Sequence, residues 1–346
     1  MLRFLYTNRI CFSFVLVFEV ACLLVTSCSV LTYSMILSET IPAVLQNVLG
    51  LQVSRTQTLV GVTLTVILPL CLLRDLASLA PFSLVGIMAM MYTSAAMVLR
   101  WLTGAYQLPL DPEAAPTLAS SLAAHLKPSF GSKGWNAVFS SQSAILISML
   151  STAFMAHYNA PKFYWELKDR SVPRFLTVVR VSFLGALMIM ALVAAAGFGT
   201  FGAASSGLIL NNYAVSDNVM ALSRLAVTIS LICSYPLAFV GVRDGVLDLC
   251  QVVDAFKRKS LFVPVTLGLL TVITTLAYYC RDISVIMALG GATWGNAVIY
   301  LFPAWMMIQL AKEKPHLESQ VPAAFLTGLI GLVLATVGTS RALQKL

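Results

Sequence analysis

Polar side chains that could bind a small solute gather near the end of an apolar segment, in the stretch SMLSTAFMAHYNAPKFYWELK. Ser151 and Thr152 supply hydroxyl groups, and His157, Asn159 and Pro161 follow shortly after them. Pro161 lacks a backbone N–H and disfavours helix at the residue before it. A helix broken here would expose N–H groups on one half and carbonyls on the other, which can hold a carboxylate and a cation. A plain helix end before a proline explains the same residues.

A second polar cluster lies in the apolar segment 219–241, where Ser230, Ser234 and Pro236 interrupt the hydrophobic run. Polar groups at membrane depth are costly and often mark a pathway for a solute or an ion. Ser and Thr hydroxyls in membrane helices also bond to a backbone carbonyl one turn earlier, without any further role. The hydroxyls of Ser230 and Ser234 are therefore candidates for binding a coupling ion, and a purely structural role is the alternative.

Other motifs that suggest chemistry are better explained by packing. Gly197, Gly199 and Gly202 spell GxGxxG, but they close an apolar helical segment and do not follow a strand, as a dinucleotide site requires. Small residues for close helix contact, or for ending the segment, are the favoured interpretation. The three histidines lie far apart in sequence, and HExxH, P-loop and GxSxG patterns do not occur. We therefore expect neither an enzyme nor a metal site.

Composition indicates that the elements positioning these residues are membrane-spanning helices. The chain has 346 residues, of which 59% are hydrophobic and 10% charged, whereas soluble domains carry about 25% charged residues. The net charge of +8 is not gathered in a nucleic-acid-binding motif, so the lipid bilayer is the expected partner and nucleic acid is not. The sequence predicts an all-α membrane protein.

Nine apolar segments are long enough to be considered as spans. They cover residues 10–37, 57–73, 79–101, 137–158, 174–201, 219–241, 261–279, 283–309 and 320–339. With the N-terminus in the cytoplasm, most Lys and Arg residues fall on the cytoplasmic side, which favours that orientation. The loop 103–135 is then non-cytoplasmic. Because no Asn lies in an N-x-[ST] site, a vacuolar, lysosomal or other endomembrane location is weakly favoured over the plasma membrane.

Five stretches in the same order resemble the amino acid/auxin permease family, which includes system-A/N and vacuolar amino acid transporters. They are LPLCLLRDLASLAPFS, AFMAHYNAPKFYWELK, GFGTFG followed by ILNNY and Asp217, CSYPLAFVGVRDGV, and GGATWGNAVIYLFPAWMMI. The resemblance covers nearly the whole chain. It implies a LeuT-type helical bundle built from a five-plus-five inverted repeat, with about nine transmembrane helices here and an incomplete first repeat.

The resemblance also assigns residues. It treats residues 1–346 as a single transmembrane transporter domain that matches the family from its third span. The family's first two spans are missing, so either the sequence is truncated, which we favour, or the protein is a degenerate relative, and the chain alone is not expected to transport. The unwound stretch of the family falls on residues 151–154. This adds Phe154 to the substrate-binding candidates Ser151, Thr152, His157 and Asn159, and it supports Ser234 as an ion ligand.

The expected function is secondary active transport of amino acids by alternating access, coupled to Na⁺ or H⁺ and requiring no other cofactor. A non-transporting membrane scaffold or nutrient sensor on the same fold is the alternative. An intramembrane enzyme is disfavoured because no catalytic pair can be located. The oligomeric state, the substrate and the coupling ion are not specified by the sequence.

Overall fold

The computed structural model describes residues 9–73, 80–108, 117–131, 142–155, 160–252 and 255–344. Within these ranges every regular element is helical, and one isolated bridge pairs Ser129 with Gly202. Seven helical segments are long and apolar enough to cross a membrane, namely Leu16–Leu49, Leu84–Leu102, Val172–Phe201, Asn218–Leu249, Arg258–Tyr279, Ile283–Glu313 and Pro315–Leu343. Arg55–Cys71 and Ser143–Ala153 are shorter apolar helices. The chain is a multi-pass integral membrane protein.

The described helices follow the predicted order. The first half contains α2 (Arg9–Leu49), α3 (Arg55–Val62), α4 (Leu68–Cys71), α5 (Ala80–Leu102), α6 (Gln142–Ala153) and α7 (Ala160–Glu166). The second half contains α8 (Val172–Phe201), α9 (Asn218–Leu249), α10 (Ala255–Tyr279), α11 (Ile283–Gly290), α12 (Phe302–Glu313) and α13 (Val321–Leu343). Short 3₁₀ helices are η3 (Leu118–Ser121), η4 (Ala124–Leu126), η7 (Ile209–Asn212) and η10 (Pro315–Gln320). Each predicted apolar segment thus contains a helix.

Three π-helical turns lie inside continuous helices. The turn η1 (Thr63–Ile67) joins α3 to α4, while η8 (Gly291–Gly295) and η9 (Ala297–Leu301) join α11 to α12. Such turns are rare, occur mostly singly and are frequent at functional sites. Two consecutive π turns with Asn296 between them are therefore the most unusual backbone in the described part of the chain.

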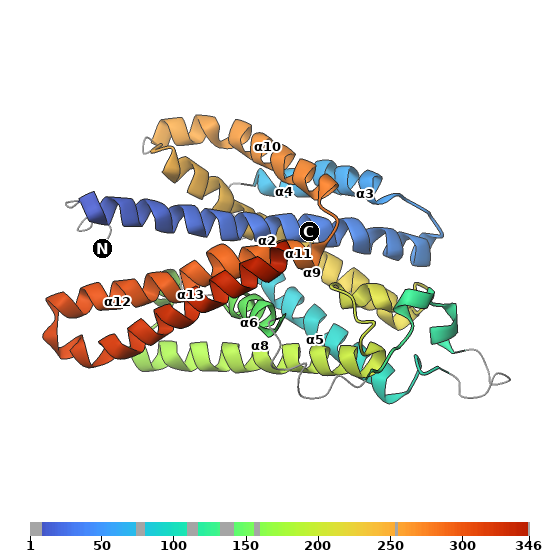
Figure 1. Ribbon diagram of the computed structural model, residues 1–346. Coiled ribbons are helices and arrows are strands. Elements are labelled where there is room, and N and C mark those ends of the chain that lie inside the picture. The colour runs from blue at the N-terminus through green and yellow to red at the C-terminus, as the bar shows by residue number, and fades with distance from the viewer. Residues whose placement is uncertain are drawn as a thin grey trace.

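The helices pack around α2 and α9. In Figure 1, α2 runs through the middle of the bundle, with α3, α4 and α10 on one side and α8, α12 and α13 on the other. The N-terminus and the α12–α13 turn lie at one end, whereas the start of α9 lies at the opposite end. Val30, Met35, Tyr235 and Phe239 bury their side chains in the main apolar core between α2 and α9. Most of the apolar side chains of α8 are exposed, as expected of a helix that faces lipid.

The observed helices extend beyond two of the predicted spans. Helix α2 continues to Leu49 and α9 to Leu249, where the sequence predicted ends near residues 37 and 241. Polar residues lower the hydropathy of the last turns of α2, but their polar groups are satisfied. Ser38 donates to the Met35 carbonyl at 2.7 Å, and Asn47 donates to the Val215 carbonyl at 2.6 Å. A hydropathy pattern cannot show such contacts, so it placed the end of α2 too early.

Candidate functional site

Helix α6, which carries the predicted substrate residues, is interrupted within the bundle. The Phe154 N–H still bonds to the Leu150 carbonyl at 3.1 Å, but the Met155 N–H bonds to Thr152 with the tighter i−3 spacing. The next helix that the structure describes, α7, begins at Ala160. The helix is therefore interrupted, as expected, at Phe154 and Met155. The prediction that residues 151–154 are unwound is wrong for residues 151–153. Ser151, Thr152 and Ala153 are helical.

The hydroxyl groups of α6 explain why the helix continues past its predicted break. Ser148 donates to the Ala144 carbonyl at 2.8 Å, and Thr152 donates to the Ser148 carbonyl at 2.9 Å. The Ser151 hydroxyl lies 2.6 Å from the Tyr300 hydroxyl of η9. These bonds satisfy each hydroxyl while leaving the backbone ladder intact, so the side chains have no need of an unwound turn.

Three of the five predicted substrate residues can be placed. Phe154 stacks on Phe183 of α8, with ring centroids 5.9 Å apart, whereas Ser151 and Thr152 contact the segment that joins α11 to α12. His157 and Asn159 lie outside the described residues. The structure therefore brings Ser151 and Thr152 together on one helix and gives Phe154 a different neighbour.

Glycines let the π-helical segment approach α6 closely. A Cβ atom added at Gly295 would lie 2.5 Å from the Thr152 hydroxyl oxygen, and one at Gly291 would lie 3.1 Å from it. Between the two π turns, the fully buried Asn296 side chain donates to the Ser148 hydroxyl at 3.1 Å. Sequence reasoning missed Asn296. The signal that could have identified it is a single amide within an apolar span. An amide at membrane depth costs free energy, and polar groups kept there usually have a function.

The predicted ion-coupling residues lie on α9, against other neighbours. A Cβ atom at Gly86 of α5 would lie 2.8 Å from the Ser230 hydroxyl oxygen, so Ser230 faces α5. Ser234 is partly buried, and α9 remains helical through Pro236. Because Pro236 has no N–H, the carbonyl of Ile232 loses its helical donor. A free carbonyl beside the Ser234 turn is compatible with ion binding, although it does not specify an ion.

A small cavity lies where α2, α3, η1 and α9 meet. Its volume of about 10 Å³ leaves room for one water-sized species. It is lined by the hydroxyl-bearing residues Ser34, Ser38, Thr58, Thr63 and Tyr235 and by the apolar residues Leu37, Leu59, Val62 and Ile67. Ser34 and Tyr235 share a hydrogen bond of 2.9 Å across the α2–α9 interface. The cavity is too small for an amino acid.

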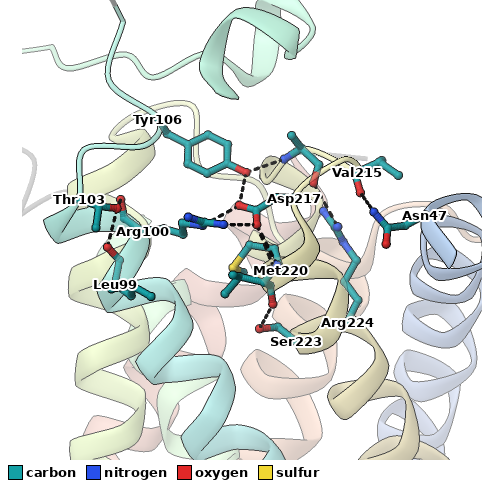
Figure 2. Close-up of polar contacts among 12 residues, drawn as sticks. Asn47, Leu99, Arg100, Thr103, Tyr106, Val215, Asp217, Met220, Ser223 and Arg224 are labelled. Carbon is teal, nitrogen blue, oxygen red and sulfur yellow. Dashed lines mark hydrogen bonds and ion pairs between the residues drawn. The ribbon is translucent and has the colours of Figure 1, made fainter. Parts of the chain in front are cut away.

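A buried ion pair, which the sequence analysis did not predict, joins α5 to the start of α9 (Figure 2). The Arg100 guanidinium donates two hydrogen bonds to the Asp217 carboxylate, at 2.6 and 2.9 Å. Tyr106 donates to the same carboxylate at 3.0 Å, and the backbone N–H groups of Val219 and Met220 donate to it as the N-cap of α9. Asp217 is thus a fully buried acceptor for five donors, which fixes the first turn of α9.

A second buried arginine holds the preceding loop. Figure 2 shows Arg224 extending from α9 toward the loop before Asp217. Its guanidinium donates to the carbonyls of Leu210, Tyr213 and Ala214 at 2.9, 2.6 and 3.3 Å. Burial, together with the nearby Asp217 carboxylate, raises the pKa of Tyr106 well above its ordinary value. Arg100 and Tyr106 bond to Asp217, and Arg224 bonds to backbone carbonyls of the loop, so we assign these side chains a structural role.

The glycine motif at the end of α8 has the packing role that the sequence favoured. A Cβ atom at Gly199 would lie 2.4 Å from the Trp101 ring of α5. Gly202 ends the helix with φ of 58°, and a Cβ atom there would lie 2.3 Å from the Ser129 carbonyl oxygen. Only glycine meets both demands at Gly202 without strain.

Comparisons with known proteins agree with this architecture. Residues 9–344 match the family described as "Transmembrane amino acid transporter protein". The chain is 24% identical over 291 residues to "Putative sodium-coupled neutral amino acid transporter 11" of Danio rerio, covering 83% of the chain and 60% of the relative. It is also 24% identical, over 324 residues, to the Rattus norvegicus protein of that name. This match covers 92% of the chain and 66% of the relative.

A further relative, "Sodium-coupled neutral amino acid symporter 2" of Danio rerio, is 26% identical over 284 residues, covering 80% of the chain and 55% of the relative. The chain thus spans less than two thirds of the length of these relatives. The family match covers almost every described residue, including the interrupted α6, the π-helical segment and the Asp217 network. The chain belongs to the transmembrane amino acid transporter protein family.

Proposed function

We propose that this chain forms part of a secondary active transporter of neutral amino acids. The observation that carries the proposal is the interruption of α6 at Phe154 and Met155, inside a bundle whose chain matches the family throughout. Helix ends at membrane depth carry partial charges and free backbone groups. They suit the carboxylate and ammonium groups of an amino acid.

In this proposal Ser151, Thr152 and Phe154 contribute to the substrate site together with His157 and Asn159. Ser230 and Ser234 on α9 bind the coupling ion, which is sodium, as in the names of the relatives, or a proton. The nine helical segments correspond to spans of a LeuT-type inverted repeat. The N-terminus lies in the cytoplasm, the loop 103–135 lies on the other side, and the protein resides in an endomembrane.

Uptake by purified protein in liposomes tests the proposal. We expect labelled neutral amino acids to enter, in response to an inward sodium gradient or an inward proton gradient, when the chain is reconstituted together with the first two spans of its family, and not when the 346-residue chain is reconstituted alone. A Ser230→Ala, Ser234→Ala double variant should lower the dependence on the coupling ion, with Ser94→Ala as a matched control, because Ser94 bonds only to its own helix at Met91. Binding of an amino acid without uptake would identify a sensor or scaffold and would contradict transport.

A further inference from the structure

The carbonyl oxygen of the Asn296 side chain is a buried acceptor without a donor. Asn296 is 0% exposed, and its Oδ1 atom has no hydrogen-bond partner among the described residues. A buried polar atom left unpaired is destabilising, and the effect is larger in a membrane because water cannot replace the missing partner. Native structures contain few such atoms, and each calls for an explanation.

The orientation of the amide is fixed by its other end. The Asn296 Nδ2 group donates to the Ser148 hydroxyl and to the Ala292 carbonyl, both at 3.1 Å. Exchanging the two ends would place the carbonyl oxygen against the Ala292 carbonyl, where neither atom can donate. The unpaired atom is therefore the carbonyl oxygen, and the site has an unused acceptor.

The neighbouring donors are already engaged elsewhere. The hydroxyls of Ser148 and Thr152 donate to carbonyls within α6, and the Thr293 hydroxyl donates to the Leu289 carbonyl at 2.6 Å. These three hydroxyls are therefore used as donors to backbone carbonyls, and no described residue donates to the Asn296 oxygen. The missing partner is a donor or a cation from outside the described residues.

The surroundings suit a ligand that enters when helices separate. Glycines at three positions keep α6, the π-helical segment and α13 in close contact around Ser148, since Gly338 of α13 also lies beside its hydroxyl. Helix α6 ends one residue beyond Thr152, and the two π turns on either side of Asn296 are a rare backbone form that is frequent at functional sites.

We propose that Asn296 binds a small cationic group, either the ammonium group of the amino acid or the coupling sodium ion. The proposal rests on the proposed transport function, and it adds a residue of the α11–α12 segment to the site predicted on α6. In the state described here the oxygen is covered, so the contact forms in another state of the transport cycle.

The test compares Asn296→Leu with Asn296→Asp and with Thr293→Val. Leucine has a similar shape and removes both polar ends, so it should not lower thermal stability. Aspartate keeps the acceptor and adds a charge that favours a cation, but its second oxygen faces the Ala292 carbonyl, so this variant should melt at a lower temperature than the wild type when no cation is bound. Thr293→Val is the matched control in the same segment, since it removes only a bond within its own helix. Purified full chains are titrated with a panel of neutral L-amino acids, with sodium chloride and with methylammonium chloride, and the melting temperature is followed.

We expect ligands to stabilise the wild type and the control alike, and Asn296→Leu to weaken one of these responses about tenfold or more. Asn296→Asp should keep that response. Loss confined to the sodium titration identifies sodium as the ligand, and loss in the amino acid and methylammonium titrations identifies the ammonium group. Unchanged binding by Asn296→Leu would overturn the inference and leave transport standing. A wild type that responds to none of the three probes would overturn both.

Discussion

Removing the carboxylate of Asp217 should unfold the start of α9 more readily than any other single change in its network. Its side chain is 0% exposed and accepts from Arg100, Tyr106 and two backbone N–H groups. Breaking a buried pair by removing one partner costs about 3–5 kcal/mol, and we expect this range for Asp217→Ala. Arg100→Ala should cost less, about 1–3 kcal/mol, because Tyr106 and the N–H groups still satisfy the carboxylate.

A double variant separates the ion pair from its surroundings. Once Asp217 is gone, Arg100 has no partner to lose, so the combined cost should fall short of the sum by about 1–3 kcal/mol. Arg174→Ala is a suitable control, because its pair with Asp169 is exposed on both sides and should contribute under about 1 kcal/mol. Size-exclusion chromatography of heated, detergent-solubilised samples would measure these differences as shifts in melting temperature. The reasoning would be refuted if the double variant lost as much stability as the two single variants together. It would also be refuted if Asp217→Ala were as stable as the Arg174→Ala control.

Three further predictions follow from the same description. Gly202→Ala should destabilise the protein by at least about 2 kcal/mol, because it combines positive φ with backbone contact, whereas Gly185→Ala, which points into open space, should be neutral in the same melting assay. Tyr106→Phe should cost about 1–3 kcal/mol at neutral pH. Burial raises the pKa of Tyr106, so the stabilisation by the neutral Tyr106 hydroxyl is fully present below about pH 10 and is lost as the pH rises further. Tyr106→Phe should therefore lose less stability than the wild type at alkaline pH. In a background without native thiols, a cysteine at Ser120 should react only from the non-cytoplasmic side and one at Ser171 only from the cytoplasmic side; the reverse pattern would show that the orientation is wrong.

The existence of the helices could be predicted from the sequence more reliably than their ends. Long apolar runs identify spans because a membrane helix must satisfy its backbone internally. The last turns of α2 are polar, and they are stabilised by contacts such as Asn47 with the distant Val215 carbonyl. A local pattern contains no information about such partners. The number of spans also stays a prediction, because the helices Arg55–Cys71 and Ser143–Ala153 are short.

The candidate site was predictable only where polar residues stand out in an apolar run. Ser151 and Thr152 were identified in this way, but the turn at which α6 ends depends on hydrogen bonds to Tyr300 and to the helix itself. The π turns around Asn296 were not predictable, since the stretch GATWGNAVIYL has the composition of an ordinary helix. The Arg100–Asp217 pair joins residues far apart in sequence, and its burial follows only from the fold.

Counterflow tests the central claim, that this protein moves amino acids across a membrane, most directly. Liposomes containing the purified protein, extended upstream by the first two spans of its family, are loaded with an unlabelled neutral amino acid and diluted into a trace of the labelled one. We predict a transient accumulation of label above its equilibrium level, because a carrier that alternates its access exchanges one substrate for another. Label that only equilibrates, at the rate seen in protein-free liposomes, would contradict the account.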